Sequence, residues 1–517
     1  MYTSHGSPAL PKGWVVTTLG EMIEPSAEKV DPLAIEKTPY VGLKHIEKAT
    51  GVLSGSGWSD DVSSTKSAFH CGDILYGKLR PYLNKVWVAD FDGVCSTDIL
   101  VFPGDQHLST QFLGFRVLST DFVDYATQNM TGVQHPRVHF DALRHFPIAL
   151  PPSAEQRRIV AKIDELFSQL DAGVAALEKA KAQLQRYRQA VFKAAMSGDL
   201  TREWREAHKD ELEPASALLD RILEERRAKW EAEQLEKMRA KGKVPKDDSW
   251  KNKYKEPAAP DMTGLPELPE GWLWTSLDAA AGEIARYPTF YGMEHLEQGV
   301  PVIRGEHLNQ DGTISHDWDN YWFVSEELSR EFPRTIVEVG DLTMSVRGSV
   351  GKLGLIDEKL QGAQVSPNCI RISILSRHCL PKVVLFYLMS FRGQSSIRKN
   401  VSATTIQTIK ASLLSRTAIP VPPLIEQGVI VEEVERRLSV AAETRRAVEQ
   451  SLKRARRLRQ GILKRAFEGK LVAQDPTDEA ASVLLERIKA DKDKRETEKK
   501  TRKKKPRKDT PQQLELI

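Results

Sequence analysis

The sequence predicts a mixed α/β protein in which two modules are separated by two long helices. Three observations support this fold class: an internal repeat of very long period, short apolar runs bounded by turn residues, and apolar residues spaced by seven along the end of each repeat. The chain has 517 residues. Because single cores stop growing at roughly 250–300 residues, we expect several domains.

The repeat joins whole modules rather than short solenoid units. The phrase Leu-Pro-x-Gly-Trp and the phrase Pro-Pro-x-x-Glu-Gln each occur twice, and the copies run without a gap after the second phrase. The matched segments are Leu10–Trp14 with Leu268–Trp272, Gly72–Leu75 with Gly340–Thr343, Pro151–Gln156 with Pro422–Gln427, and Gly198–Leu200 with Gly469–Leu471. Between these segments the two interiors barely align, so we expect one fold that reads two different things.

The interiors contain both strand and helix patterns. Strands are predicted at Lys85–Ala89 and Ile99–Phe102, and alternation predicts another through Val365, Ile370, Ile372 and Ile374. Helices are predicted at Gln111–Tyr125 and Val383–Phe391. The two tryptophans of the repeated phrase, Trp14 and Trp272, are expected to be core anchors.

A long helix is predicted after each Pro-Pro pair. In the first copy, Ser153 and Gln156 fit a capping box, which the second copy lacks because Leu424 replaces the serine. A helix of about 44 residues would be about 66 Å long. Apolar residues spaced by seven form a coiled-coil seam in each helix, with the other copy as the nearest partner. The seam residues are Ile163, Leu170, Leu177, Leu184 and Val191, and Val434, Ala441, Val448, Ala455 and Ile462. The alternative is that each helix packs only on its own module.

No catalytic or metal-binding pattern is found. Gly72–Leu79 matches the start of a phosphate loop but has Leu79 where a Ser or Thr hydroxyl is needed, and its middle is an apolar strand pattern. His135 and His139 have a ligand spacing only in a helix, and Pro136 between them disfavours a helix. The four cysteines form no CxxC pair. We therefore expect no metal site, no catalytic residue and no cofactor bound by this chain.

The charge is unevenly distributed. The formal net charge is only +4, yet residues 489–508 contain 12 Lys or Arg and 4 Asp or Glu, a net charge of +8, which leaves −4 for the rest. This tail is either a solvated, disordered end or a nucleic-acid contact arm. No apolar run is long enough to span a membrane and no secretory signal is visible, so with few cysteines we expect a cytoplasmic protein.

Taken together, the duplicated phrases and the helix after each module resemble the specificity (S) subunit of type I restriction–modification systems. Each motif is weak alone, but their order and duplication are specific together. The resemblance covers nearly the whole chain. The stretch from Arg202 to Pro260 is longer than in compact members of that family.

This resemblance implies a non-catalytic DNA-recognition subunit. The two modules would be target recognition domains, each of which reads one half of a bipartite, asymmetric site in double-stranded DNA. The two helices would form an antiparallel coiled coil that sets the half-site spacing and docks two methyltransferase (M) subunits. S-adenosylmethionine would be bound by those M subunits, which methylate adenine, and ATP and Mg would be used by restriction (R) subunits.

The predicted domain boundaries follow the repeat. They are 1–152 for the first recognition domain, 153–200 for the first repeated helix, 201–265 for a charged helical extension and linker, 266–423 for the second recognition domain, 424–472 for the second repeated helix, and 473–517 for a short helix and basic disordered tail.

Candidate DNA-reading residues are polar and basic side chains on glycine-marked or strand-flanking loops, since Arg can bind guanine, and Asn or Gln adenine, through paired hydrogen bonds. In the first module they are Lys78, Arg80, Asn84, Gln134, His135 and Arg137. In the second module they are Arg304, Arg347, Ser349, Lys352, Thr404, Thr405 and Gln407. For each of them, ordinary surface polarity or a phosphate contact is the alternative.

Two other functions stay open at this point. The chain could be a self-contained DNA methyltransferase or nuclease with unrecognised motifs, which would act on DNA without a partner. It could also be a coiled-coil scaffold without DNA specificity, which would show no sequence preference in competition binding.

Overall fold

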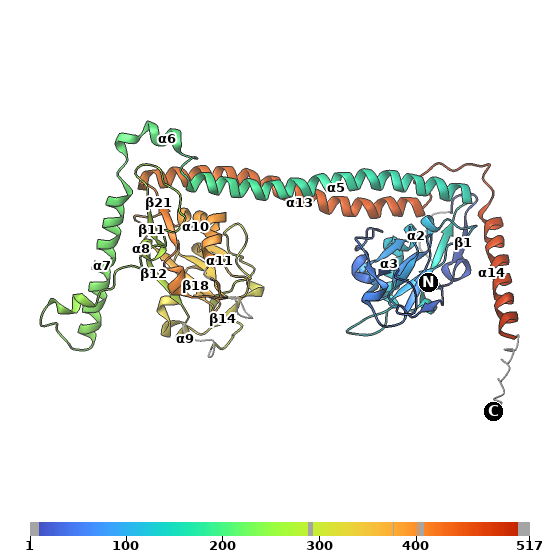
Figure 1. Cartoon of the computed structure of the whole chain (residues 1–517), viewed down its shortest axis with the longest axis horizontal. Helices are drawn as coiled ribbons and strands as arrows, with labels where there is room; N and C mark the ends of the chain where they lie inside the picture. The colour runs from blue at the N-terminus through green and yellow to red at the C-terminus, as the bar shows by residue number, and fades with distance from the viewer. Residues whose placement is uncertain (1–9, 288–292, 376, 400, 403–407, 505–517) are drawn as a thin grey trace, which may run out of the picture. The chain divides into compact units, whose positions relative to one another are not determined.

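The computed structural model describes residues 10–287, 293–375, 377–399, 401–402 and 408–504. The chain forms two compact units (Figure 1), one built from Met1–Glu178 and Glu449–Ile517 and the other from Lys179–Val448. Each unit contains one α/β module and one half of each long helix. The chain therefore changes unit in the middle of both helices.

The first module is held together at its two ends. Strand β1 (Val15–Thr18) pairs antiparallel with β10 (Pro147–Leu150), which places the repeated tryptophan phrase beside the entry to the long helix. Between them lie two sheets, with strand orders β2-β5-β8-β3-β4 and β7-β6-β9. Their strands are β2 Lys29–Val30, β3 Pro39–Val41, β4 Gly57–Trp58, β5 Lys66–Phe69, β6 Ile74–Gly77, β7 Val86–Val88, β8 Gly93–Cys95 and β9 Ile99–Phe102; the helices are α1 Leu19–Met22, α2 Thr110–Leu118, α3 Thr120–Gln128 and α4 Phe140–Leu143.

The second module repeats this frame. Strand β11 (Leu273–Ser276) pairs antiparallel with β21 (Ala418–Val421), and the two larger sheets have strand orders β12-β18-β15-β16 and β14-β13-β17. The strands are β12 Ala281–Arg286, β13 Val300–Ile303, β14 Trp322–Val324, β15 Leu342–Ser345, β16 Leu353–Leu355, β17 Gln364–Val365 and β18 Cys369–Ile374, with β19 Val401–Ser402 and β20 Thr408–Ile409 as a small pair; the helices are α8 Leu277–Ala280, α9 Glu326–Glu331, α10 Pro381–Met389, α11 Phe391–Lys399 and α12 Ala411–Leu414.

The predicted elements of the modules are confirmed in part. Strands β7 and β9 lie where they are expected. The single strand predicted from the alternating apolar residues between Val365 and Ile374 is two strands, β17 and β18. The single helix expected over Gln111–Tyr125 is instead two helices that meet at Ser119, which ends α2 and begins α3. The helix expected over Val383–Phe391 is likewise divided, because α10 ends at Met389 and Phe391 begins α11. Strand β6 occupies the middle of the incomplete phosphate loop, in agreement with its apolar pattern.

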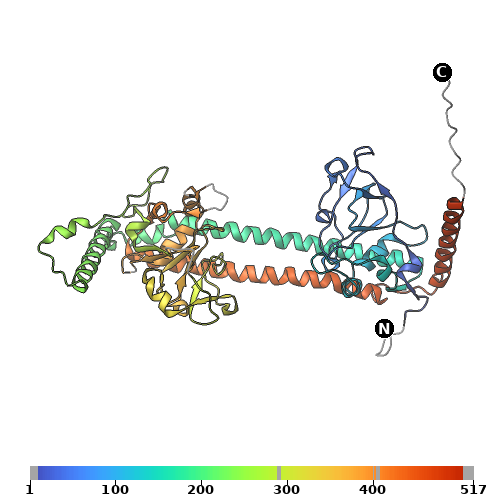
Figure 2. The same cartoon turned by 90° about the horizontal axis from the view of Figure 1, so that it is seen from below.

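The long helices are α5 (Ser153–Met196) and α13 (Leu424–Phe467), each of 44 residues. Within the first unit, Ile163 near the start of α5 shares one apolar core with Ile462 near the end of α13. Within the second unit, Val191 near the end of α5 shares a core with Val434 near the start of α13. The helices are therefore antiparallel in each unit, as Figure 2 also shows.

The seam residues are buried to different degrees. Ile163, Val191, Val434, Val448, Ala455 and Ile462 are buried, whereas Leu170, Leu177, Leu184 and Ala441 are half-buried. In α5 the seam is buried near both ends of the helix and half-buried between them, whereas in α13 Val448, near the middle, is buried as well.

The capping box predicted at Ser153 and Gln156 is wrong. The Gln156 amide donates to the Pro151 carbonyl (2.9 Å), and its oxygen accepts from the Ser109 amide N–H (3.2 Å). Gln427 makes the same pair of contacts in the second module, with Pro422 (3.0 Å) and Leu380 (2.7 Å). The repeated glutamine therefore fastens each long helix to its module, because a buried side-chain amide must find partners.

A helix follows each copy and docks on the module of the other copy, where its apolar residues join that module's core. Helix α7 (Ala215–Ala240) and helix α14 (Ala481–Lys504) both begin with a backbone bond to the glycine of the tryptophan phrase, from Ala215 to Gly271 and from Ala481 to Gly13. The helix expected within residues 473–517 is α14, but it is not short: it continues to Lys504, so the basic stretch that we expect to be disordered is helical over residues 489–504. Helix α6 (Arg202–Ala207) lies between α5 and α7.

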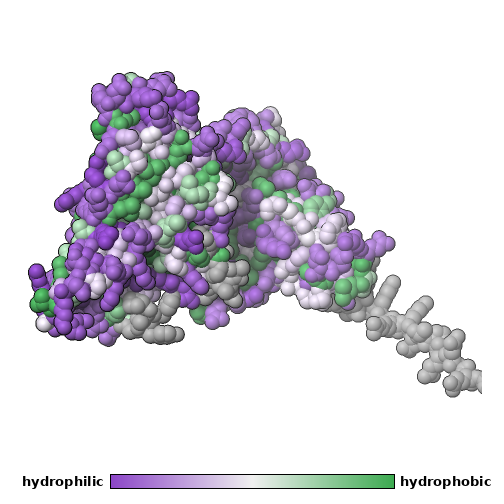
Figure 3. Space-filling view, turned by 60° about the vertical axis from the view of Figure 1, so that its left-hand side comes forward, coloured by the Kyte–Doolittle hydropathy of each residue, from purple (hydrophilic) through white to green (hydrophobic). Residues whose placement is uncertain are grey.

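The surface of the described residues is largely polar, as expected for a sequence in which 28% of the residues are charged. The face in Figure 3 is mostly hydrophilic, with apolar residues scattered over it. Among the described residues, no helix is long and apolar enough to cross a membrane.

Candidate nucleic-acid interface

In each module a hairpin loop pairs with a second segment of the chain, and the described parts of these segments contain most of the candidate DNA-reading residues. In the first module the hairpin loop, residues 78–85, joins β6 to β7, and the bridge loop, residues 131–137, follows α3. Leu79 and Arg137 form an isolated antiparallel bridge between them. The Arg80 N–H donates to the Pro136 carbonyl (2.7 Å), and the Val138 N–H donates to the Lys78 carbonyl (3.1 Å).

In the second module the hairpin loop pairs with the start of β20 in a similar way. Its hairpin loop, residues 346–352, joins β15 to β16, and Arg347 forms a bridge with Thr408, the first residue of β20. The Ile409 N–H donates to the Val346 carbonyl (3.1 Å), matching the bond from Val138 to Lys78. Thr404, Thr405 and Gln407 lie outside the described residues.

The first-module candidates differ in exposure. Arg80, Gln134 and His135 are exposed and Lys78 is half-buried. Asn84 is 5% exposed and its amide donates to the Leu118 carbonyl (2.8 Å), so this side chain is used inside the module.

The backbone of the first hairpin loop is unusual at two positions. Arg80 (φ 52°) and Asn84 (φ 47°) adopt left-handed conformations on either side of the short 3-10 helix Pro81–Leu83. This conformation costs a non-glycine residue energy, so the surrounding contacts must hold it. The hydrogen bond from Arg80 to Pro136 and the one from Asn84 to Leu118 supply those contacts, so they hold the hairpin loop in a single backbone conformation.

Arg137 is held by an acidic partner. Its Nε lies 2.8 Å from Oδ1 of Asp98 and its Nη2 lies 3.3 Å from Oδ2, while Nη1 donates to the His135 carbonyl (3.2 Å). The hydrogen bond with Asp98 raises the pKa of Arg137 above its already high usual value. The pair joins the bridge loop to the turn before β9.

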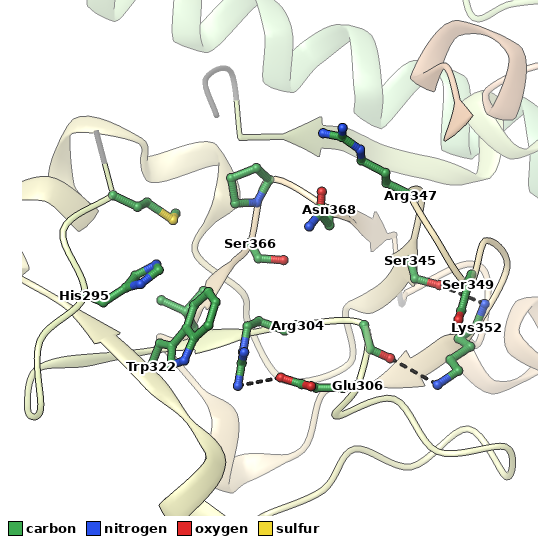
Figure 4. Close-up of a pocket in the computed structure, with 14 residues that line it drawn as sticks. His295, Arg304, Glu306, Trp322, Ser345, Arg347, Ser349, Lys352, Ser366 and Asn368 are labelled. Carbon is green, nitrogen blue, oxygen red and sulfur yellow. Dashed lines mark hydrogen bonds and ion pairs between the residues drawn. The ribbon is translucent and has the colours of Figure 1, made fainter. Parts of the chain in front are cut away.

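The second module has a cavity beside its hairpin loop, with a volume of about 510 Å³. Arg304, Arg347, Ser349 and Lys352, all predicted from the sequence, line it together with Asn368 and Trp322. Figure 4 shows Arg347 and Asn368 close together at one end, with Arg304 and Trp322 across from them.

Arg304 is fixed within this cavity. Its guanidinium lies 3.7 Å from the centre of the Trp322 ring, and it forms an ion pair with Glu306 (2.5 Å). Lys352 donates to the Gly305 carbonyl (3.4 Å), as its counterpart Lys85 does to the Leu43 carbonyl (2.5 Å). Lys352 therefore also ties the hairpin loop to the neighbouring strand.

The electrostatics of the cavity favour an anionic or acceptor-rich partner. Near the cavity, burial and, to a smaller extent, the charge of Arg347 lower the pKa of Arg286. The charged side chains that line the cavity are Arg304, Arg347, Lys352 and Glu306, which gives the cavity a positive balance. Guanidinium and amide donors of this kind suit phosphates and the acceptors of base edges.

Two histidines missed by the sequence reading shape both modules. Nδ1 of His45 accepts from the Gly42 N–H (3.0 Å), and Nδ1 of His307 accepts from the Arg304 N–H (3.2 Å). Burial lowers the pKa of both. Each imidazole thus fixes a turn, and the two turns match. The sequence signal that could have identified these histidines is the loose similarity of residues 39–46 to residues 301–308.

The described residues contain no cluster of three or more His, Cys, Asp or Glu that could hold a metal ion. Burial raises the pKa of the Cys95 and Cys379 thiols to about 12 and that of Cys369 to about 11. These three side chains are therefore protonated and packed. They are poor candidates for a thiolate nucleophile.

Comparisons with known proteins agree with the repeat. Residues 11–184 and 282–453 each match the family model of the type I restriction modification DNA specificity domain. The type I restriction enzyme EcoDI specificity subunit of Escherichia coli is 32% identical over 226 residues, which is 43% of this chain and 50% of that protein. The EcoBI specificity subunit of Escherichia coli is 26% identical over 67% of this chain and 64% of that protein. The chain thus aligns with half to about two thirds of these relatives.

The fold also matches a solved structure. A chain described under "Structural basis underlying complex assembly and conformational transition of the type I R-M system" aligns with a TM-score of 0.62 and 21% identity, over 90% of this chain and 100% of that chain. With two copies of the family domain on this frame, the chain belongs to the type I restriction–modification DNA specificity family.

Proposed function

We propose that this chain is a non-catalytic subunit that gives a type I restriction–modification complex its DNA sequence specificity. Each module reads one half of a bipartite, asymmetric site in double-stranded DNA. The observation that carries this proposal is the pair of matched loop sites, which share backbone bonds and differ in side chains. Two modules with the same backbone arrangement and different side chains are what recognition of an asymmetric target requires.

The long helices suit a spacer. At 1.5 Å per residue a 44-residue helix is about 66 Å long, and one turn of DNA is roughly 34–36 Å. We propose that the paired helices hold the two half-sites about one turn of DNA apart. We propose that the exposed faces of these helices dock two M subunits, with R subunits added to the complex in the cytoplasm.

Catalysis belongs to the partners in this proposal. S-adenosylmethionine is bound by the M subunits, and ATP and Mg by the R subunits. Adenine methylation requires the base to leave the stack, so the M subunits must lie beside the recognised sequence. The described residues of this chain supply loops and helices for that positioning.

The test is selection from a random double-stranded DNA library. The full-length chain, alone and with its M subunits, is expected to enrich two short sequences at a fixed separation. Enrichment of no sequence would contradict the proposal and favour a scaffold. Methyl transfer to DNA by the purified chain without any partner would contradict its non-catalytic role.

A further inference from the structure

Three matched positions around the paired loops carry different side chains in the two modules. In the first module they are Leu79, Asp98 and Arg137; in the second they are Arg347, Asn368 and Thr408. Leu79 and Arg137 form a cross-loop bridge, and Arg347 and Thr408 form the corresponding one. The arginine of the bridge therefore comes from the bridge loop in the first module and from the hairpin loop in the second.

The third position is matched by its backbone bonds. The Asp98 carbonyl accepts from the Lys78 N–H (2.9 Å), and the Asn368 carbonyl accepts from the Val346 N–H (2.8 Å). The serine two residues earlier is matched as well, with bonds from Ser96 to Val41 (3.0 Å) and from Ser366 to Ile303 (2.9 Å). Equivalent backbone thus presents a carboxylate in one module and an amide in the other.

The surroundings of this position differ in charge. Asp98 is engaged by Arg137, so the first module presents a closed, neutral pair. Asn368 is exposed and lines the cavity next to Arg347, so the second module presents an amide beside a guanidinium. An amide both donates and accepts, which a paired carboxylate cannot do.

We propose that these three positions set the different base preferences of the two modules, and that Asn368 is a base-contacting residue of the second. This inference rests on the proposed function. Asparagine binds adenine through its N6 and N7 edge, and a neighbouring Arg binds guanine, so a purine read in the major groove is the chemical class that fits. In the first module, Asp98 and Arg137 act as one unit, and Asp98 positions the arginine.

The central variant is Asn368→Asp, which places the first-module residue in the second module. The matched control is Asn252→Asp, the same change at an exposed asparagine in the extension after α7. A second variant, Asp98→Asn, alters the matched position of the first module. All three are made in the full-length chain and selected on a random DNA library with the M subunits present.

Asn368→Asp is expected to change the preferred base at one or two positions of a single half-site and to weaken binding to the original site about 10- to 100-fold. Asp98→Asn is expected to change the other half-site. Asn252→Asp should behave as the wild type. Circular dichroism of each variant checks that the fold is kept.

Three results would overturn this inference. One is an unchanged target and affinity for Asn368→Asp in a chain whose wild type selects a bipartite site. Another is an equal loss of affinity for all sequences, which would identify a phosphate contact. The third is a wild type that enriches no sequence, which would overturn the proposed function as well.

Discussion

Glu155 and Glu426 occupy matched positions at the start of the two long helices, and the two carboxylates have different surroundings. Each accepts a hydrogen bond from the indole of the repeated tryptophan, Trp14 at 2.9 Å and Trp272 at 2.8 Å. Both tryptophans are 8% exposed, which confirms them as core anchors. The duplicated phrases are therefore two ends of one buried contact, repeated in each module.

The second carboxylate has further partners. Glu426 also accepts from Arg205 (2.7 Å) and from the Thr201 hydroxyl (2.6 Å), whereas one oxygen of Glu155 has no hydrogen-bond partner among the described residues. Both side chains are almost fully buried. Burial raises the pKa of Glu155 above its usual value.

Substituting Glu426 with Gln is expected to destabilise the second unit by about 3–5 kcal/mol, because it leaves the Arg205 charge without its buried partner. The matched change Glu155→Gln should cost much less, since it removes only the charge assistance of one hydrogen bond. Hydrogen exchange at the start of α13 and of α5 measures the two effects. Equal losses in both units would contradict this account.

The pH dependence of the stability of Glu155→Gln has a definite sign. A carboxyl whose folded pKa is raised binds its proton more tightly in the folded state, so its stabilising contribution is lost as pH rises from the usual value of 4.5 through the raised pKa. Glu155→Gln removes this loss. Relative to wild type, the variant should gain stability as the pH rises above 4.5, as measured by urea unfolding; an unchanged difference in stability would contradict this account.

At the scale of elements, two glycines end the long helices at matched turns. Gly198 (φ 72°) and Gly469 (φ 68°) follow α5 and α13 in left-handed conformations. A Cβ at Gly198 would lie 2.4 Å from Cγ of Pro269, and one at Gly469 would lie 2.3 Å from Cγ of Pro11. These prolines belong to the repeated Leu-Pro-x-Gly-Trp phrase, so the two repeated motifs are in contact.

Gly198→Ala and Gly469→Ala are each expected to lower stability by about 1–3 kcal/mol, since they combine a left-handed backbone with a clash. Gly173→Ala is the matched control in the middle of α5, where a Cβ would meet nothing within 4 Å. It should raise stability by about 0.5–1 kcal/mol, because glycine is a poor helix former. Thermal unfolding of the three variants is the measurement, and a Gly173→Ala loss would be the contrary result.

Elements with a strong period could be predicted from the sequence. The seven-residue spacing and the Pro-Pro entry indicated both long helices, because those patterns are local. The break between α2 and α3 could not be seen, because apolar residues continue across it. It occurs at Ser119, whose hydroxyl donates to the Arg116 carbonyl (2.7 Å) and so ends the first helix.

The site was predictable only in part, for a similar reason. Lys78, Arg80 and Arg137 were selected as loop residues, and the structure brings their loops together through the bridge of Leu79 with Arg137. That pairing joins residues far apart in sequence, so no local pattern reveals it. The sequence did not identify Asp98 and Asn368 as site residues, because the equivalence of these two positions is visible only in their backbone hydrogen bonds.

At the scale of the whole molecule, the duplication carries a prediction about symmetry. A chain in which the second module is replaced by a copy of the first would have two identical readers on antiparallel helices. Because target symmetry follows protein symmetry, it should select a palindromic bipartite site. Library selection on this chimera is the measurement. Selection of the original asymmetric site would contradict the assignment of one half-site to each module.

The uneven charge also has its meaning at this scale. The basic stretch follows the second repeat, and α14 begins with buried residues such as Leu484 and Ile488 before the basic residues start. The net charge of the modules is modest, so sequence readout in our proposal rests on a few placed donors. Partner subunits would supply much of the remaining contact with phosphates.

The most direct test of the central claim is a change in the length of both helices. Seven residues that keep the seam are inserted after Glu178 in α5 and after Val448 in α13, the points where the chain passes between units. This adds about 10 Å of helix, or about 3 base pairs of DNA. Library selection should then return the same two half-sites with a spacer longer by about 3 base pairs. An unchanged spacer would contradict the account.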